Sequence, residues 1–246
     1  MHAGTIDPAP MVIGHRGAAG SAPENTIAGI EAAARLGVAW VEFDVKLTRD
    51  NQTVLFHDDR LQRTTDGRGA FAANDFASLR RLDAGSWFAP AFGGERVPTL
   101  DEALEALATY NLGANVEIKP SPGRERATAY AVARSLHRHW PEHLPQPLLS
   151  SFSAAALAVA RDVAPGVPRA LLVHRRPRDW LAQARRLDCV ALHANQRHMT
   201  PDWARTALTV GLALRCFTVN DPRRAARLLA WGVESIITDH PERLLG

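Results

Sequence analysis

Residues 11–45 read MVIGHRGAAGSAPENTIAGIEAAARLGVAWVEFDV. Two short apolar runs in this stretch, MVIG (11–14) and AWVEFDV (39–45), are typical of buried strands. Between them lies NTIAGIEAAARLG, an Ala-rich segment that opens on Asn and ends at Gly, as helix caps require. A strand, a helix and a second strand in this order predict a parallel strand pair with a crossover helix.

The same alternation continues through the rest of the chain. Six further strand-like runs are ANVEI (114–118), PLLSS (147–151), RALLV (169–173), CVALH (189–193), LALRCFTV (212–219) and VESIIT (233–238). Ala-, Leu- and Arg-rich stretches, such as TLDEALEALATYNLG and DPRRAARLLAWG, separate several of them. Eight parallel strands in a chain of 246 residues predict a single α/β domain over residues 1–246, a (β/α)₈ TIM barrel.

The regular spacing breaks once, after the second strand. Residues 58–98 contain the Gly-rich RTTDGRG (63–69) and the aromatic run AGSWFAPAFGG (84–94) before the next helix. We therefore expect a small insertion at this point, placed where it can cover the mouth of the barrel.

Composition excludes several classes of protein. No run approaches the ~18 apolar residues of a membrane span and no leader pattern is visible, so we expect a cytoplasmic protein without a membrane span. Cys189 and Cys216 are too few for a disulfide framework. The net charge is +3, but the densest basic run, Arg175, Arg176 and Arg178, indicates a solvated loop and no nucleic-acid partner. The oligomeric state is not encoded in any pattern of this kind.

Three carboxylates occupy strand positions that should be buried. Glu42 and Asp44 are two residues apart in the second strand, so both point to one face, which in a barrel is the interior. Glu117 lies near the end of the third strand. Burying such groups unpaired costs roughly several kcal/mol each, which a bound cation offsets. Carboxylates without thiolates favour one divalent cation, Mg²⁺ or Ca²⁺.

An alternative explanation needs no metal. The same acids can form a buried salt-bridge network with Arg16, Lys46 or Lys119, the last two being the only lysines in the chain.

Two histidines lie close to strand ends. His15 and Arg16 follow the first strand between Gly14 and Gly17, which let the backbone turn sharply. Arg offers a planar fork of donors to phosphate oxygens and His exchanges protons near neutral pH, so the pair suits a phosphoryl group. His57 closes the run TVLFHD (53–58) after the second strand.

Three more polar residues follow later strands, on the face where barrel active sites form: His193, Asn220 and Asp239. Each of them, taken alone, is more often structural. The histidines that we expect in loops or on the surface are His137, His139, His143, His174, His198 and His240.

From about residue 11 to the end, the chain resembles the glycerophosphodiester phosphodiesterase family and looks like its cytosolic bacterial form. The blocks that carry the resemblance are GHRGAAGSAPENT, VEFDVKLTRD, TVLFHD, RTTDGRG, VPTLDEAL, NVEIKP, SSFS, FTVN and TDHP. The resemblance implies that His15 and His57 form an acid–base pair. It also implies that Glu42, Asp44 and Glu117 bind the divalent ion.

The resemblance predicts metal-dependent hydrolysis of glycerophosphodiesters, such as glycerophosphocholine or glycerophosphoethanolamine, to glycerol 3-phosphate and an alcohol. This activity belongs to lipid and glycerol metabolism. The predicted substrate-binding residues are Arg16, Lys119, His193 and Phe217. Family members often carry Trp where this chain has Phe217, so an aromatic side chain is kept there.

The sequence leaves three features of the function open. The nucleophile is either water or a hydroxyl of the substrate, and the assignment of acid and base to the two histidines is undefined. A related phospholipase-type lyase that releases a cyclic phosphate is one alternative. A non-catalytic barrel that binds phosphodiesters is another.

Overall fold

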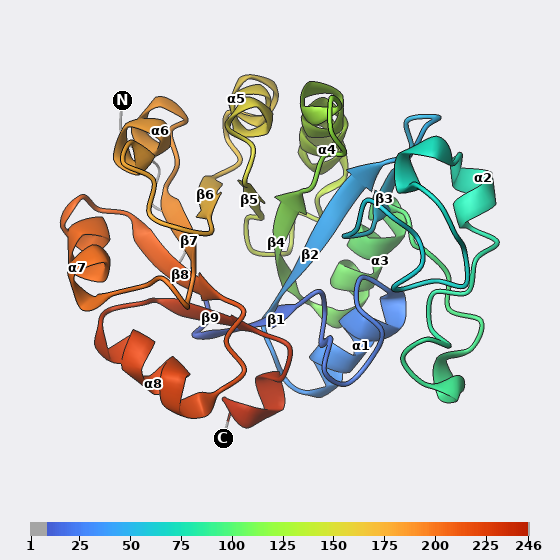
Figure 1. Ribbon diagram of the computed structural model, residues 1–246, viewed down its shortest axis with the longest axis horizontal. Coiled ribbons are helices and arrows are strands. Elements are labelled where there is room, and N and C mark those ends of the chain that lie inside the picture. The colour runs from blue at the N-terminus through green and yellow to red at the C-terminus, as the bar shows by residue number, and fades with distance from the viewer. Residues whose placement is uncertain (1–8, 246) are drawn as a thin grey trace.

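A computed structural model describes residues 9–245 of the chain. Its eight parallel strands close into a barrel, because β1 pairs with β9 on one side and with β2 on the other. The strands lie at the centre of Figure 1. They are β1 (Val12–His15), β2 (Trp40–Leu47), β4 (Gly113–Ile118), β5 (Leu148–Ser151), β6 (Arg169–Val173), β7 (Ala191–Asn195), β8 (Ala213–Phe217) and β9 (Ser235–Thr238). The predicted TIM barrel is confirmed.

Helices surround the strands (Figure 1). They are α1 (Ile27–Arg35), α3 (Leu100–Tyr110), α4 (Glu125–His139), α5 (Ala154–Val163), α6 (Trp180–Arg186), α7 (Pro201–Thr209) and α8 (Pro222–Ala230). Two expected caps are present, because Thr99 and Asp221 accept backbone N–H groups at the starts of α3 and α8. At α1 the cap is Thr26, one residue after the expected Asn25. After β9 the described residues contain the 3₁₀ helix η3 (Pro241–Arg243), where a regular barrel has its last α-helix.

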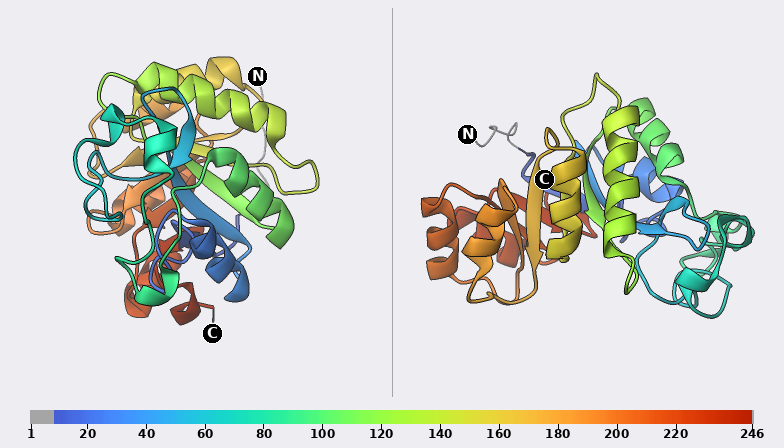
Figure 2. Two further views of the ribbon diagram at one scale, coloured as in Figure 1. Left: turned by 90° about the vertical axis from the view of Figure 1, so that its right-hand side faces the viewer. Right: turned by 90° about the horizontal axis from the view of Figure 1, so that it is seen from above.

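The insertion after β2 contains more regular structure than the sequence indicated. The short strand β3 (Thr53–Leu55) pairs antiparallel with the end of β2, and η1 (Phe71–Ala73), α2 (Phe76–Leu79) and η2 (Pro90–Phe92) follow. Phe56 stacks on Phe71 at a centroid distance of 4.9 Å within a separate apolar cluster. Figure 2 shows this segment projecting from one side of the barrel.

The packing of β2 explains why its polar residues point inward. Val41, Phe43 and Val45 are all 0% exposed and pack in the apolar layer that also contains residues of α3 and α4. Since successive side chains of a strand point to opposite faces, the residues between them project into the barrel. Glu42 and Asp44 are those residues.

One strand boundary differs from expectation in a way that matters. The run CVALH was expected to end its strand at His193, but β7 continues to Asn195. His193 therefore lies inside the strand and is fully buried, at 0% exposure. All eight parallel strands, β7 included, agree with the predicted runs to within two residues at each end, as short buried strands allow.

Within residues 9–245, no helix combines the length and the apolar character that a membrane crossing needs. The predicted cytoplasmic location is a separate matter and stays a prediction.

Candidate active site

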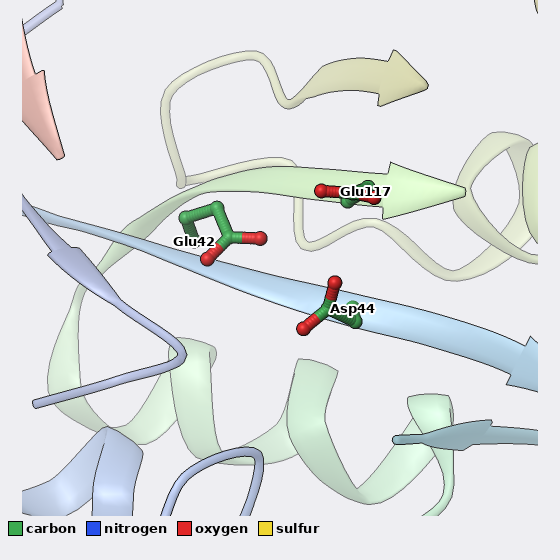
Figure 3. Close-up of side chains that lie close together, drawn as sticks. All are labelled: Glu42, Asp44 and Glu117. Atoms are coloured by element: carbon green, nitrogen blue, oxygen red, sulfur yellow. The ribbon is translucent and has the colours of Figure 1, made fainter. Parts of the chain in front are cut away.

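The three predicted carboxylates lie together inside the barrel. Asp44 on β2 is directly in register with Glu117 on β4, and Glu42 is on the same face of β2. Oxygen atoms of the three residues lie within 4.8 Å of one another. Figure 3 shows the three side chains gathered between the two strands. Glu42, Asp44 and Glu117 are buried, with exposures of 4%, 1% and 7%.

Their protonation reflects crowding of negative charge. Burial and the neighbouring carboxylates of Asp44 and Glu117 raise the pKa of Glu42 well above its usual range. Burial and Asp44 raise the pKa of Glu117 to about 7. Asp44 behaves in the opposite way: burial opposes ionisation, but Arg16 and Lys119 together lower its pKa. Burial and mutual repulsion therefore disfavour the ionised forms of Glu42 and Glu117.

Two cations already contact the cluster, so the salt-bridge alternative is correct in part. Arg16 Nε lies 3.2 Å from Asp44, and Lys119 Nζ lies 2.9 Å from Glu117 and 3.4 Å from Asp44. Lys46 is not a member of this network, because its Nζ donates to Asp59 of the insertion over 2.8 Å.

Asn25 holds Asp44 from the loop between β1 and α1. Its side-chain amide donates to Asp44 Oδ2 over 2.9 Å and its oxygen accepts the backbone N–H of Asp44 over 3.1 Å. Asn25 has a left-handed backbone, with φ of 56°. A short polar residue tolerates that conformation better than most.

The Gly residues around His15 and Arg16 serve the packing of the loop itself. Gly17 has φ of 88°, and a Cβ atom there would lie 2.5 Å from the backbone of Gly29 in α1. Only glycine fits at position 17 of this turn. In the same turn the backbone N–H of Arg16 donates to Glu42 over 3.1 Å. The turn thus ties the first strand's end to the acid cluster.

His15 is held between an acid and the cluster. Its Nδ1 lies 2.5 Å from Asp239 after β9, and its Nε2 lies 3.8 Å from Glu42. Asn220 donates to the other oxygen of Asp239 over 2.7 Å and accepts the Asp239 backbone N–H. Although burial opposes it, the hydrogen bond with His15 lowers the pKa of Asp239 to about 2. Asn220 and Asp239 therefore hold His15.

His57 has a similar partner on its own segment. Its Nδ1 lies 2.6 Å from Asp58, and that carboxylate is also bound by Arg63. Burial lowers the pKa of His57, and the positive charges of Arg16 and Lys119 add to this effect. The negative charge of Asp44 and the hydrogen bond with Asp58 oppose it. At neutral pH His57 is thus mainly an uncharged imidazole.

The predicted aromatic residue Phe217 lies at the end of β8 in a group of three rings. Phe152 after β5 and His174 after β6 stack at 4.6 Å, and Phe217 meets both rings edge-on. Lys119 Nζ lies 5.5 Å from the Phe152 ring centroid, which connects this aromatic group to the acid cluster. His174 is in a loop, as expected, yet belongs to the barrel mouth.

His193 is placed differently from the other predicted residues. Neither ring nitrogen has a hydrogen-bond partner among the described residues, and burial together with Arg215 lowers its pKa well below the usual range. Contact between His193 and a substrate stays a prediction.

Sequence reasoning did not assign roles to Glu24, Asn25, Asp58 or Arg63. All four lie in quoted motifs, PENT, HD and RTTDGRG, so the signal was present. Their partners could not be inferred, because the contacts join three separate segments.

A closed barrel with acids, basic residues and two aspartate-paired histidines at the carboxyl ends of its strands defines an α/β-barrel enzyme site. The chain matches the Glycerophosphoryl diester phosphodiesterase family over residues 15–243 and belongs to that family. It is a phosphoric diester hydrolase of this family, as the resemblance predicted.

Individual relatives match over nearly their whole length. A glycerophosphodiester phosphodiesterase of Caldanaerobacter subterraneus is 33% identical, covering 96% of each chain. One from Bacillus subtilis is 29% identical, covering 94% of this chain and 84% of the relative. A phosphodiesterase structure from Oleispira antarctica, in complex with the product sn-glycerol-3-phosphate, has a TM-score of 0.93 and 39% identity, covering 96% of this chain and 95% of that chain.

Proposed function

We propose that the protein hydrolyses glycerophosphodiesters, such as glycerophosphocholine or glycerophosphoethanolamine, to glycerol 3-phosphate and an alcohol with the help of one divalent cation. The observation that carries this proposal is the buried cluster of Glu42, Asp44 and Glu117. Two histidines lie close to this cluster, each paired through Nδ1 with an aspartate. The product bound by the Oleispira antarctica relative supports the same substrate class.

The residues present fit a hard divalent cation, Mg²⁺ or Ca²⁺. The three carboxylates offer only oxygen ligands, and burial and neighbouring carboxylates raise the pKa values of Glu42 and Glu117. Glu42, Asp44 and Glu117 would hold the ion. When bound, the cation supplies a Lewis acid for the phosphoryl oxygens.

Arg16 and Lys119 are the donors available to the phosphate group. The buried Nε of Arg16 lies 3.2 Å from Asp44 but forms no hydrogen bond among residues 9–245, so its N–H can donate to an anionic ligand. Lys119 is 23% exposed at its side chain and so remains accessible from the mouth. Phe217 offers an apolar ring to the glycerol carbons. We also assign a substrate-binding role to His193, which lies deeper in the barrel.

The aspartate partners orient both histidines for proton transfer. When Nδ1 of each ring donates to Asp239 or Asp58, Nε2 of the neutral ring is left without a proton. One histidine, with Nε2 unprotonated, takes the proton of the nucleophile. The other, when it carries a second proton on Nε2, gives that proton to the leaving alkoxide. Either ring fits either role. The nucleophile is water or the substrate's own hydroxyl.

The test is a coupled assay for released glycerol 3-phosphate across several headgroups. We expect His15→Ala and His57→Ala each to lower turnover by about two or more orders of magnitude, because each removes a proton-transfer group. His137→Ala, on the exposed face of α4, is the matched control and should be fully active. Near-normal turnover in either active-site variant removes that histidine from the mechanism.

Two further measurements test the metal and the reaction type. EDTA should abolish activity, and Mg²⁺ or Ca²⁺ should restore it; full activity in EDTA contradicts the metal assignment. Phosphorus NMR should show glycerol 3-phosphate as the final product. A cyclic phosphate that persists indicates a lyase.

A further inference from the structure

We propose that Arg63, a residue of the insertion, positions both His57 and Arg16 by holding the carboxylates that bind them. This inference rests on the proposed function, because it concerns the geometry of a proposed catalytic histidine. Arg63 touches neither the acid cluster nor, by this proposal, the substrate. It acts through Asp58 and Glu24.

The guanidinium group of Arg63 binds two carboxylates at once. Its Nε and Nη2 donate to the two oxygens of Asp58 over 2.7 and 2.8 Å. Its Nη1 and Nη2 donate to the two oxygens of Glu24 over 2.6 and 2.8 Å. Both pairs have the two-bond geometry in which a planar guanidinium fixes the orientation of a carboxylate.

Each of these carboxylates also binds a residue of the proposed active site. Asp58 Oδ1 lies 2.6 Å from His57 Nδ1. Glu24 Oε1 accepts Arg16 Nη1 over 2.5 Å. Since Arg16 Nε lies 3.2 Å from Asp44, a continuous chain of charged groups connects His57 to the acid cluster. Arg63 is the only described residue that contacts both Asp58 and Glu24 by ion pairs.

The position of Arg63 indicates that it orients its carboxylate partners more than it stabilises the fold. Its side chain is 45% exposed, and exposed ion pairs contribute little to folding. Glu24 and Asp58 are less exposed, at 10% and 25%, so their two negative charges need the cation that lies between them. Without it, Asp58 loses the contact that orients it toward His57.

Arg63→Met tests this inference. We expect kcat to fall by about 10- to 100-fold, because His57 loses the support that orients it, with a smaller rise in KM because Arg16 is also displaced. Arg63→Lys should be intermediate, because an ammonium group cannot bind two carboxylates with paired bonds. Arg60→Met is the control and should be unchanged, because Arg60 is exposed in the same insertion and its side chain forms no hydrogen bond or ion pair within residues 9–245.

Two readouts separate positioning from a general structural effect. Nitrogen-15 NMR of His57 should show the proton on Nδ1 in the wild type and a mixture of tautomers in Arg63→Met. In a Glu24→Gln/Asp58→Asn background, adding Arg63→Met should change kcat by less than about two-fold, since residues that act through one another are not additive. The melting temperature should stay the same.

Three outcomes overturn the inference: unchanged kcat, a raised KM at constant kcat, or a kcat loss that follows a lower melting temperature. Failure of the proposed function looks different. If His57→Ala retains turnover, the catalytic role of His57 is wrong whatever Arg63 does. If His57→Ala abolishes turnover while Arg63→Met does not reduce it, only the role of Arg63 is wrong.

Discussion

At the scale of single residues, the site depends on how each charged group is paired. Arg16 and Lys119 lower the pKa of Asp44, whereas burial and neighbouring carboxylates raise the pKa values of Glu42 and Glu117. His15 and His57 each have an aspartate at Nδ1, but one aspartate follows β9 and the other is adjacent in sequence. The same histidine–aspartate pairing is thus formed once between distant segments and once between neighbouring residues.

Asp239→Asn should impair His15 without removing it. The amide can donate where the carboxylate accepted, so Nδ1 would lose the partner that keeps the proton there. We expect turnover to fall by about two orders of magnitude with little change in KM. Glu242→Gln is the control, because Glu242 in η3 pairs with a different histidine, His240. Steady-state kinetics of both variants check the result. Normal kcat in Asp239→Asn contradicts a role in orienting His15.

Metal binding should release protons near neutral pH. Because the pKa of Glu117 is about 7, this group is partly protonated at that pH, and a cation binds only its ionised form. Affinity should therefore fall as pH drops from about 8 to about 6. Calorimetry in two buffers of different ionisation heat measures the protons released. The Glu117→Gln variant should release fewer protons on binding the metal. Binding heats of the wild type that are the same in both buffers contradict the prediction.

At the scale of elements, the predictability of each segment follows from its length and surroundings. The eight barrel strands were predictable because buried parallel strands are continuous apolar runs. β3 was missed, since three residues carry little periodicity and its partner in β2 defines it. The acids were predicted from a spacing of two within one strand. The contact of His15 with Asp239 was not, because 224 residues separate them.

The start of α3 offers a measurable element-scale effect. Thr99 and Glu102 form a capping box, with the Thr99 hydroxyl accepting the Glu102 N–H over 3.1 Å and Glu102 accepting the Thr99 N–H over 2.8 Å. Thr99→Ala should lower the free energy of unfolding by about 1 kcal/mol. Thr109→Ala, on the exposed end of the same helix, should change it by less than about 0.5 kcal/mol. Urea unfolding of both variants gives the comparison, and equal stabilities contradict the cap.

At the scale of the whole molecule, closure of the barrel assembles the site. β1 lies between β9 and β2, so His15 reaches both Asp239 and Glu42 only when the first and last strands have paired. The barrel sheet therefore has no free parallel edge near the histidine. Formation of this site and completion of the fold are one event.

The two cysteines should report unfolding of the whole barrel. Both are buried, and burial raises the pKa of Cys189 and Cys216 to about 12, so neither is a thiolate at neutral pH. Iodoacetamide should label neither in the native protein and both after denaturation. Labelling should rise at the same urea concentration as the loss of circular dichroism. Labelling of either thiol in the folded enzyme would reveal local opening instead.

The hydrogen bond between Leu55 and Pro98 has a consequence for how such enzymes diversify. Over 2.9 Å it joins the two points where the insertion leaves and rejoins the barrel. The segment between them has its own apolar cluster, so it forms a separate structural unit whose two ends lie side by side. We therefore expect that this segment can be replaced by a relative's without a change in barrel length or strand register. Such an exchange should alter the segment that projects from the barrel while the acids of β2 and β4 remain in place.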